Sequence, residues 1–135
     1  MDSGLITAFD RSGKANAGHA LETAVLVELE RRRCERACVR TREGFEVDFL
    51  ATPLTGRPVL IQVCADVSAA DTRAREFRSL VAAMVEHKRL SALLLTKDST
   101  GISVAQSEAP KGVTIRPAWE GLLEGGDAVL DHDHR

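Results

Sequence analysis

Two stretches of the chain carry apolar residues three and four positions apart, a spacing that predicts two long α-helices. The first, residues 18–33, has a stripe made of Leu21, Val25, Leu26 and Leu29. The second, residues 69–88, has a stripe made of Phe77, Leu80, Val81 and Met84. Ser68 is the expected N-cap of this second helix, and Asp71 falls in its first turn, where the helix dipole favours an acid.

An alternation of apolar and polar residues predicts an antiparallel pair of strands between these helices. Residues 37–41 form the first strand and residues 45–50 the second, with a turn at residues 42–44. The second strand has period two, and it is expected to point Phe45, Val47 and Phe49 to one face and Glu46 and Asp48 to the other. One face of this strand is therefore predicted to be buried, and the other to carry acids.

Two further strands are predicted from nearly continuous apolar runs at residues 59–64 and 92–96, a pattern typical of strands buried on both faces. Because the helix at 69–88 lies between them, they form a strand–helix–strand crossover and run parallel. A last strand is expected at residues 113–116, and a short final helix is expected to open at Pro117. The sequence thus predicts an α/β fold with a mixed sheet, an antiparallel pair followed by parallel strands, flanked by helices.

Length and composition favour one globular domain of 135 residues. Apolar residues make up 44% of the chain and charged residues 28%, and no apolar run approaches the roughly 20 residues that span a bilayer. The N-terminus lacks the apolar core of a signal peptide, and three cysteines are too few for a disulfide framework. We therefore expect a cytoplasmic protein with no membrane partner, in which residues 18–119 fold between an N-terminal segment, 1–17, and an acidic tail, 120–135.

Arginine dominates the basic residues and clusters in one part of the chain. Six arginines fall within twelve positions: Arg31, Arg32, Arg33, Arg36, Arg40 and Arg42. The planar guanidinium group suits phosphate, so this cluster favours a polyanionic partner such as nucleic acid. The alternative is a solvated helix end and edge strand that bind nothing. Charge alone leaves both interpretations open.

Two polar side chains stand out at neighbouring places in the predicted sheet. Gln62 interrupts an otherwise apolar strand, and a buried amide without hydrogen-bond partners costs about 1–3 kcal/mol. Asp48 lies near the end of the preceding strand, so the two side chains are expected to converge, with Glu22 approaching from the first helix. Such oxygen ligands suit Mg²⁺, which can activate a water towards a phosphodiester. The alternative is a hydrated hairpin face, with Gln62 satisfying the end of a sheet.

Four sequence blocks, in order, strengthen the metal interpretation by resemblance. They are GHALE from residue 18, RTREGFEVDF from residue 40, IQVC from residue 61 and TRARE from residue 72. Together they resemble the uncharacterised C-terminal domain of a large prokaryotic family of AAA+ ATPases, a domain assigned to the PD-(D/E)XK nuclease-like superfamily. The likeness runs from about Gly18 to Trp119. The superfamily core is a helix, an antiparallel strand pair, a central strand, a crossover helix and a further strand, the order predicted above.

The resemblance implies a catalytic site that this chain keeps only in part. Glu22 matches the acid of the first helix, and Asp48 matches the metal-binding aspartate. Gln62 stands where the superfamily has Asp, Glu or sometimes Gln, and Cys64 stands where it has the catalytic lysine. A cysteine is mostly a neutral thiol at neutral pH, so it cannot supply the fixed positive charge beside the attacked phosphate. Both replacements point towards little or no cleavage and towards a Mg²⁺ or Mn²⁺ site that is weak or lost.

A cation brought in from elsewhere could replace the missing lysine, and Arg75 is the candidate. It belongs with Thr72 and Glu76 to the first turns of the second helix, where free N–H groups suit anions. The alternative is a capping and ion-pair cluster that only fixes where this helix begins. The chain contains no P-loop, so an AAA+ module would have to be a separate partner.

These observations predict a nuclease-like domain with a degenerate active site that is nucleic-acid-associated or regulatory. Its site would consist of Glu22, Asp48 and Gln62 around a weak Mg²⁺ position, with Cys64 at the catalytic position. Phosphates would be contacted by Arg31, Arg32, Arg33, Arg40, Arg42 and Arg75. One alternative is an active metal-dependent nuclease with a relocated cation. The other is an interaction or oligomerisation module, in which a homodimer is one expected form.

Overall fold

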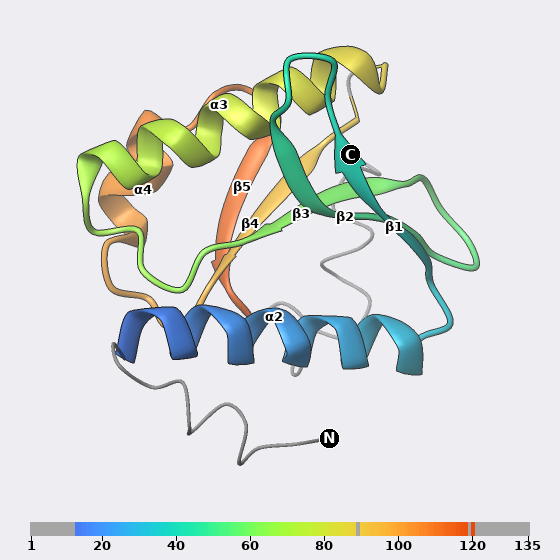
Figure 1. The fold of residues 1–135 in the computed structure, drawn as a ribbon, viewed down its shortest axis with the longest axis horizontal. Helices are drawn as coiled ribbons and strands as arrows, with labels where there is room; N and C mark the ends of the chain where they lie inside the picture. Colours follow the sequence, from blue (N-terminus) through green and yellow to red (C-terminus); the bar gives the residue numbers. More distant parts are fainter. Residues whose placement is uncertain (1–12, 89, 119, 121–135) are drawn as a thin grey trace.

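The computed structural model of this chain describes residues 13–88, 90–118 and 120. One sheet lies between a helix on one face and two helices on the other, which gives three layers (Figure 1). The helices are α2 (Gly13–Arg31), α3 (Ala70–Glu86) and α4 (Ile102–Glu108). The strands are β1 (Glu35–Arg40), β2 (Glu46–Thr52), β3 (Val59–Val63), β4 (Ala92–Thr96) and β5 (Val113–Pro117).

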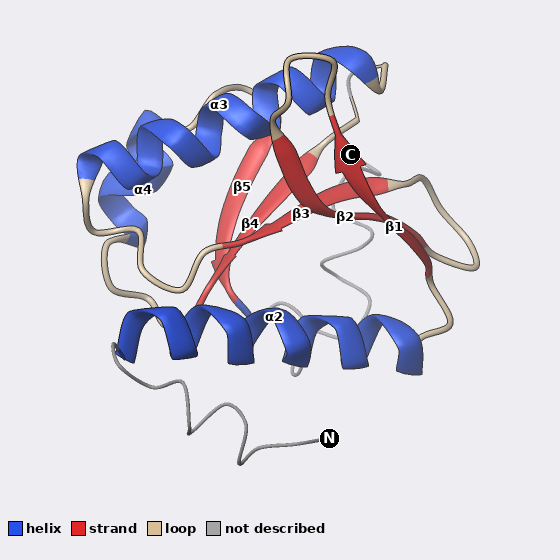
Figure 2. Ribbon diagram, in the orientation of Figure 1, coloured by secondary structure: helices blue, strands red, loops and turns tan. Residues whose placement is uncertain are grey.

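The five strands lie in the order β1-β2-β3-β4-β5 (Figure 2). β1 pairs with β2, and β2 with β3, in antiparallel fashion, whereas β3, β4 and β5 run parallel. The predicted fold class, an α/β mixed sheet with antiparallel followed by parallel strands, is therefore confirmed. All five residues of β4 are buried, as expected for an apolar run covered on both faces.

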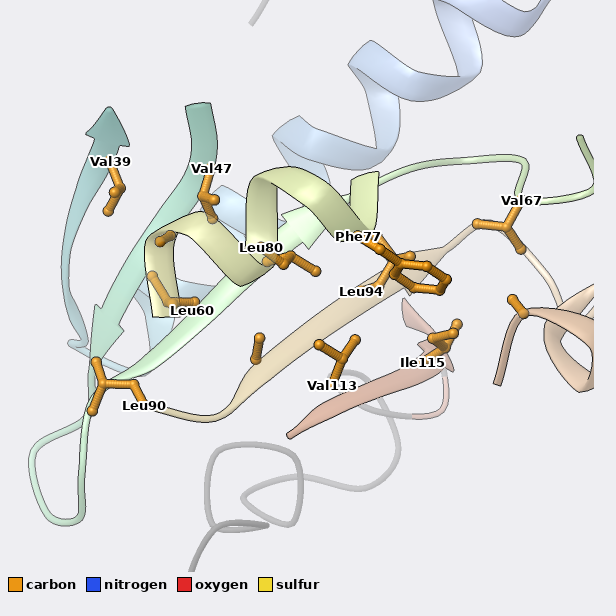
Figure 3. Close-up of a cluster of buried hydrophobic side chains, with 13 residues drawn as sticks. Val39, Val47, Leu60, Val67, Phe77, Leu80, Leu90, Leu94, Val113 and Ile115 are labelled. Carbon is orange, nitrogen blue, oxygen red and sulfur yellow. The ribbon is translucent and has the colours of Figure 1, made fainter. Parts of the chain in front are cut away.

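Two hydrophobic cores fill the spaces between the layers. The core beneath α2 contains Val25 and Leu29 from the helix and Ile61 and Leu93 from the sheet. The core on the α3 side is larger; Figure 3 shows its side chains from the sheet together with Phe77 and Leu80 of α3 and Val67 of the segment before α3. Alternate residues of β4 enter alternate cores, which explains why that strand is apolar throughout.

The predicted facing of β2 is wrong in one respect. Val47 packs in the core on the α3 side, whereas Phe49 packs beneath α2, although period two would place both on one face. The register between β1 and β2 shifts, because Ala37 pairs with Leu50 while Val39 pairs with Val47. The extra residue in β2 is a bulge, and it reverses the direction in which the following side chains point.

Several local predictions about α3 and its neighbours also need correction. Ser68 is not the N-cap of α3; Ala69 holds that position without a side-chain hydrogen bond, and the Ser68 hydroxyl donates to Asp66 instead. Val81 is 39% exposed and does not complete the buried stripe. Pro117 is the last residue of β5, and most of the final helix expected from it lies outside the described residues.

The helix α4 was not predicted, and α2 begins at Gly13 rather than at residue 18. α4 follows a left-handed residue, Gly101, and buries only Ala105, so its seven residues show no apolar periodicity in the sequence. Arg73 joins α4 to the start of α3: its guanidinium donates two hydrogen bonds to Glu108 and two to the carbonyls of Val67 and Ser68. These contacts fix the loop that enters α3. Among the described helices, none has both the length and the apolarity needed to cross a membrane.

Candidate functional site

The candidate site lies where β2 and β3 separate at one end of their ladder. The paired residues of these strands end at Phe49 and Ile61, which leaves Asp48 and Gln62 just beyond the ladder. The bulge of β2 falls at the same place, so that Asp48 and Phe49 together face Cys38 of β1. Bulges of this kind re-aim a side chain and are frequent beside functional sites.

Asp48 and Gln62 replace the missing ladder bonds with their side chains. The Asp48 N–H donates to Oε1 of Gln62 over 2.8 Å, and the Val63 N–H donates to Oδ2 of Asp48 over 2.8 Å. The amide nitrogen Nε2 of Gln62 in turn donates to Oε1 of Glu76 over 2.7 Å. Gln62 is buried, and this network satisfies its amide, which explains how a polar residue is tolerated in a central strand.

A pocket of about 540 Å³ opens beside this network. Four carboxylates line it: Glu22 of α2, Asp48 of β2, Glu76 of α3 and Asp66 from the segment between β3 and α3. Arg75 and Lys97 line the same pocket and contribute positive charge. The structure thus brings Glu22 and Asp48 to one place, as expected. Gln62 does not line the pocket but lies behind it, bonded to both Asp48 and Glu76.

Two carboxylates of this pocket, Asp48 and Glu76, have raised pKa values because nearby positive charge does not offset their burial. Burial raises the pKa of Asp48 to about 6, the hydrogen bond from the Val63 N–H opposes that rise, and the negative charges of Glu22, Glu76 and Glu46 add to it. Burial also raises the pKa of Glu76, although the Gln62 amide and then Arg75 act in the opposite direction. Arg75 forms an ion pair with Glu76 at 3.8 Å, but its side chain is 65% exposed, so solvent weakens the pair and the rise in the Glu76 pKa is not reversed.

The described residues do not complete a metal site. They contain no group of three or more His, Cys, Asp or Glu side chains arranged to hold a metal ion. Two of the expected ligands also serve the fold, because Oε1 of Gln62 accepts the Asp48 N–H and Oδ2 of Asp48 accepts the Val63 N–H. Gln62 lies behind the pocket rather than in its lining, so of the three expected Mg²⁺ ligands the pocket presents Glu22 and Asp48.

Cys64 carries no positive charge at the position where the resemblance implies a catalytic lysine. Its thiol donates to the carbonyl oxygen of Asp66 at 3.4 Å, and burial, followed by the charge of Glu76, raises the thiol pKa to about 11. The side chain is therefore neutral at physiological pH, with neither the charge of a lysine nor the nucleophilicity of a thiolate.

Three charged pocket residues, Glu76, Lys97 and Asp66, were not among the predicted metal and catalytic residues, although Glu76 was noted in the cluster at the start of the second helix. Lys97 directly follows β4, and its N–H donates to the carbonyl of Ala65 after β3. Because parallel strands end at the same edge of a sheet, the residue after β4 could have been expected near the residue after β3. The position of Glu76 was harder to predict from the sequence, since only the folded chain shows that Gln62 donates a hydrogen bond to it.

The arginine cluster lies at the other end of α2 from the pocket. α2 covers 13 residues between Gly18, which lines the pocket, and Arg31, a span of about 20 Å. Most of the cluster is ion-paired: Arg31 and Arg32 with Glu28, Arg36 with Glu30 and Arg40 with Glu46. The hydrogen bond from Arg31 is the main reason that the pKa of Glu28 falls to about 2.

Arg33 and Arg42 are the remaining members of the cluster. Both are exposed, and neither forms a side-chain ion pair with another described residue. They flank β1 at its two ends, so the cluster forms a row along this edge strand. We call this row, Arg31 to Arg42, the arginine edge. It is separate from Arg75, which lies at the pocket.

Searches of protein-family models, curated proteins and solved structures found no match to this chain.

Proposed function

We propose that this chain is a nuclease-like domain with a degenerate active site, and that it associates with nucleic acid through the arginine edge without cleaving it. The observation that carries the proposal is the convergence of Glu22, Asp48 and Glu76 on one pocket at the end of the β2–β3 ladder. These acids come from three elements that are distant in sequence. The element order and the positions of Glu22 and Asp48 agree with what the PD-(D/E)XK resemblance implies.

The loss of cleavage is supported by charge. The pocket is lined by four acids, Glu22, Asp48, Asp66 and Glu76, and by two bases, Arg75 and Lys97. This excess of acid repels a phosphate unless a divalent cation binds first, and one oxygen of Asp48 and the amide oxygen of Gln62 already accept hydrogen bonds within the fold. With a neutral thiol at Cys64, no fixed positive charge stands at the catalytic position.

The association with nucleic acid is supported by the arginine edge. β1 is an outer strand of the sheet, six residues or about 20 Å long, and it carries Arg36 and Arg40. Arg31 and Arg40 keep 69% and 70% of their side-chain area exposed despite their ion pairs. Exposed pairs of this kind are weak, and phosphate groups can compete for the guanidinium. The resemblance also predicts an AAA+ ATPase partner, which stays a prediction.

Salt-dependent binding of duplex and single-stranded DNA tests this association. The wild-type chain is expected to bind with an affinity that falls as salt rises. The variant Arg33→Ala/Arg42→Ala removes two potential phosphate contacts and should lower the slope of log K against log salt by roughly two. The matched control Lys88→Ala/Lys111→Ala removes the same charge from exposed positions that do not belong to the arginine edge and should leave the slope nearly unchanged.

Two results would overturn the proposal. The absence of any binding at low salt would remove the nucleic-acid association. Equal effects of the arginine and lysine variants would mean that binding follows net charge alone rather than the arginine edge. Divalent cations are left out of these titrations, so the outcome does not depend on the pocket.

A further inference from the structure

The outer face of α3 carries an apolar surface that the fold leaves uncovered. Val81 and Val85 are 39% and 73% exposed. On one side of them lies a hollow of about 650 Å³, between α3 and the turn that joins β1 to β2, whose floor includes Phe45 and Phe77. Figure 1 shows this turn beside α3, and the Arg42 N–H donates to the Glu86 carboxylate there.

A second hollow lies on the other side of the same two valines. It measures about 460 Å³ and is lined by Met84 and Pro110 in addition to Val81 and Val85. The two valines, which we call the valine ridge, therefore stand between two hollows. Helices associate by packing such ridges into grooves, so this face has the shape needed to receive a ridge of its own kind.

The charges at the two ends of the valine ridge are opposite. Arg78 precedes the ridge and lies 6.0 Å from the ring centre of Phe45. Glu86 follows the ridge, and it lies eight residues and about 12 Å beyond Arg78 along α3. Both charged residues line the 650 Å³ hollow. If two copies of α3 cross in antiparallel fashion near Ala82, Arg78 of each copy comes opposite Glu86 of the other.

We propose that this face binds a second copy of the chain, as a two-fold homodimer built on α3. A two-fold interface uses the same patch on both partners, so the patch must be complementary to itself. The valine ridge with its adjacent hollows meets this condition in shape, and Arg78 and Glu86 meet it in charge. A partner whose surface carries charge of only one sign would place a like charge opposite either Arg78 or Glu86. The proposal does not depend on nucleic-acid binding, since the valine ridge, Arg78 and Glu86 are not part of the arginine edge, although Arg42 of that edge lines the adjoining hollow.

Sedimentation and light scattering over a concentration series test the dimer. The wild-type chain is expected to be dimeric at concentrations of about 100 µM and to dissociate on dilution. Val85→Glu places a charge on the valine ridge and should give a monomer with an unchanged circular dichroism spectrum. Val104→Glu, the same change at a valine of α4 that is 51% exposed, is the matched control and should remain dimeric.

A charge exchange then tests the antiparallel arrangement. Arg78→Glu and Glu86→Arg should each weaken the dimer by about tenfold, because each places like charges opposite one another. The double variant restores opposite charges across the two-fold axis and should recover most of the wild-type affinity. A wild-type monomer throughout the series, a Val85→Glu dimer, or a double variant as weak as the single ones would each overturn the proposal.

Discussion

Gln62 is the residue on which the geometry of the pocket depends. Its side chain joins β2 to α3, because Oε1 accepts the Asp48 N–H while Nε2 donates to Glu76. A polar residue in an apolar strand was a sound indication of an unusual place in the fold. The structure assigns the amide a structural task, which was one of the two interpretations left open by the sequence.

Replacing Gln62 should therefore cost stability. Gln62→Leu leaves the Asp48 N–H and the Glu76 carboxylate without this partner, and we expect the free energy of unfolding to fall by about 1–3 kcal/mol. Urea denaturation at pH 7 measures the change. Thr114→Val is the control, because Thr114 is half-buried in β5 and its side chain forms no hydrogen bond with the described residues. A loss equal to that of the control would contradict this role.

Asp48 should make the stability of the protein depend on pH. The native state holds the Asp48 proton up to about pH 6, whereas the unfolded chain releases it near the ordinary carboxyl pKa of about 4. Unfolding therefore releases a proton within this window, and the free energy of unfolding falls as pH rises from about 4 to about 6 and stays lower above it. Two pKa units set an upper limit of about 3 kcal/mol on this effect.

Asp48→Asn tests that dependence. An asparagine keeps an oxygen that can accept the Val63 N–H but carries no charge, so the variant should be more stable than wild type at pH 7 and similar to it near pH 4. Urea denaturation between these pH values gives the comparison. Glu35→Gln, at an exposed position of β1, should leave the wild-type profile unchanged. A variant that loses stability at pH 7 would show that the Asp48 charge supports the fold.

Site residues could be predicted from the sequence where a polar residue interrupted a local apolar pattern. They could not be predicted where only the fold brings distant residues together. Glu22 and Asp48 were predicted to converge, and both line the pocket. The positions of Lys97 and Glu76 beside Asp48 were not predicted, because they depend on the pairing of β3 with β4 and on the packing of α3. The arginines looked available for phosphate, but the acids that pair with them lie up to six positions away.

Among the secondary-structure elements, the strongest apolar patterns gave the most accurate predictions. β4 has the predicted bounds, and α3 differs from its prediction by only a few residues at its ends. The bulge in β2 was missed because a register shift depends on the neighbouring strand rather than on β2 alone. α4 was missed because a helix of seven residues with one buried side chain has no periodicity to detect.

Two glycine substitutions should separate local helix propensity from backbone strain. Gly101 begins α4 with a φ of +79°, and a Cβ there would lie 3.4 Å from the Cα of Ser68. Gly101→Ala should therefore lower the free energy of unfolding by about 1 kcal/mol or more. Gly18, inside α2, has nothing within 4 Å of a Cβ, so Gly18→Ala should raise it by about 0.5–1 kcal/mol. Urea denaturation of both variants checks this, and the same sign for both would contradict it.

The fold places three surfaces on different elements. The acidic pocket lies at the end of the β2–β3 ladder, the arginine edge follows β1, and the valine ridge lies on the outer face of α3. The last two surfaces adjoin at Arg42, which lines the 650 Å³ hollow beside the ridge. A nuclease would need a divalent cation and a fixed positive charge at the pocket. The pocket has instead an excess of acids with hydrogen-bonded oxygens and a neutral thiol. This arrangement is the basis of our proposal that the chain binds nucleic acid without cleaving it.

The most direct measurement is a nicking assay on supercoiled plasmid, with the chain in excess over DNA and with Mg²⁺ or Mn²⁺ present. Binding is followed in the same mixtures by gel shift. We predict a shifted plasmid that stays supercoiled, for the wild-type chain and for Asp48→Ala alike. Divalent-cation-dependent nicking by the wild-type chain that disappears in Asp48→Ala would contradict the degenerate site and identify a working nuclease.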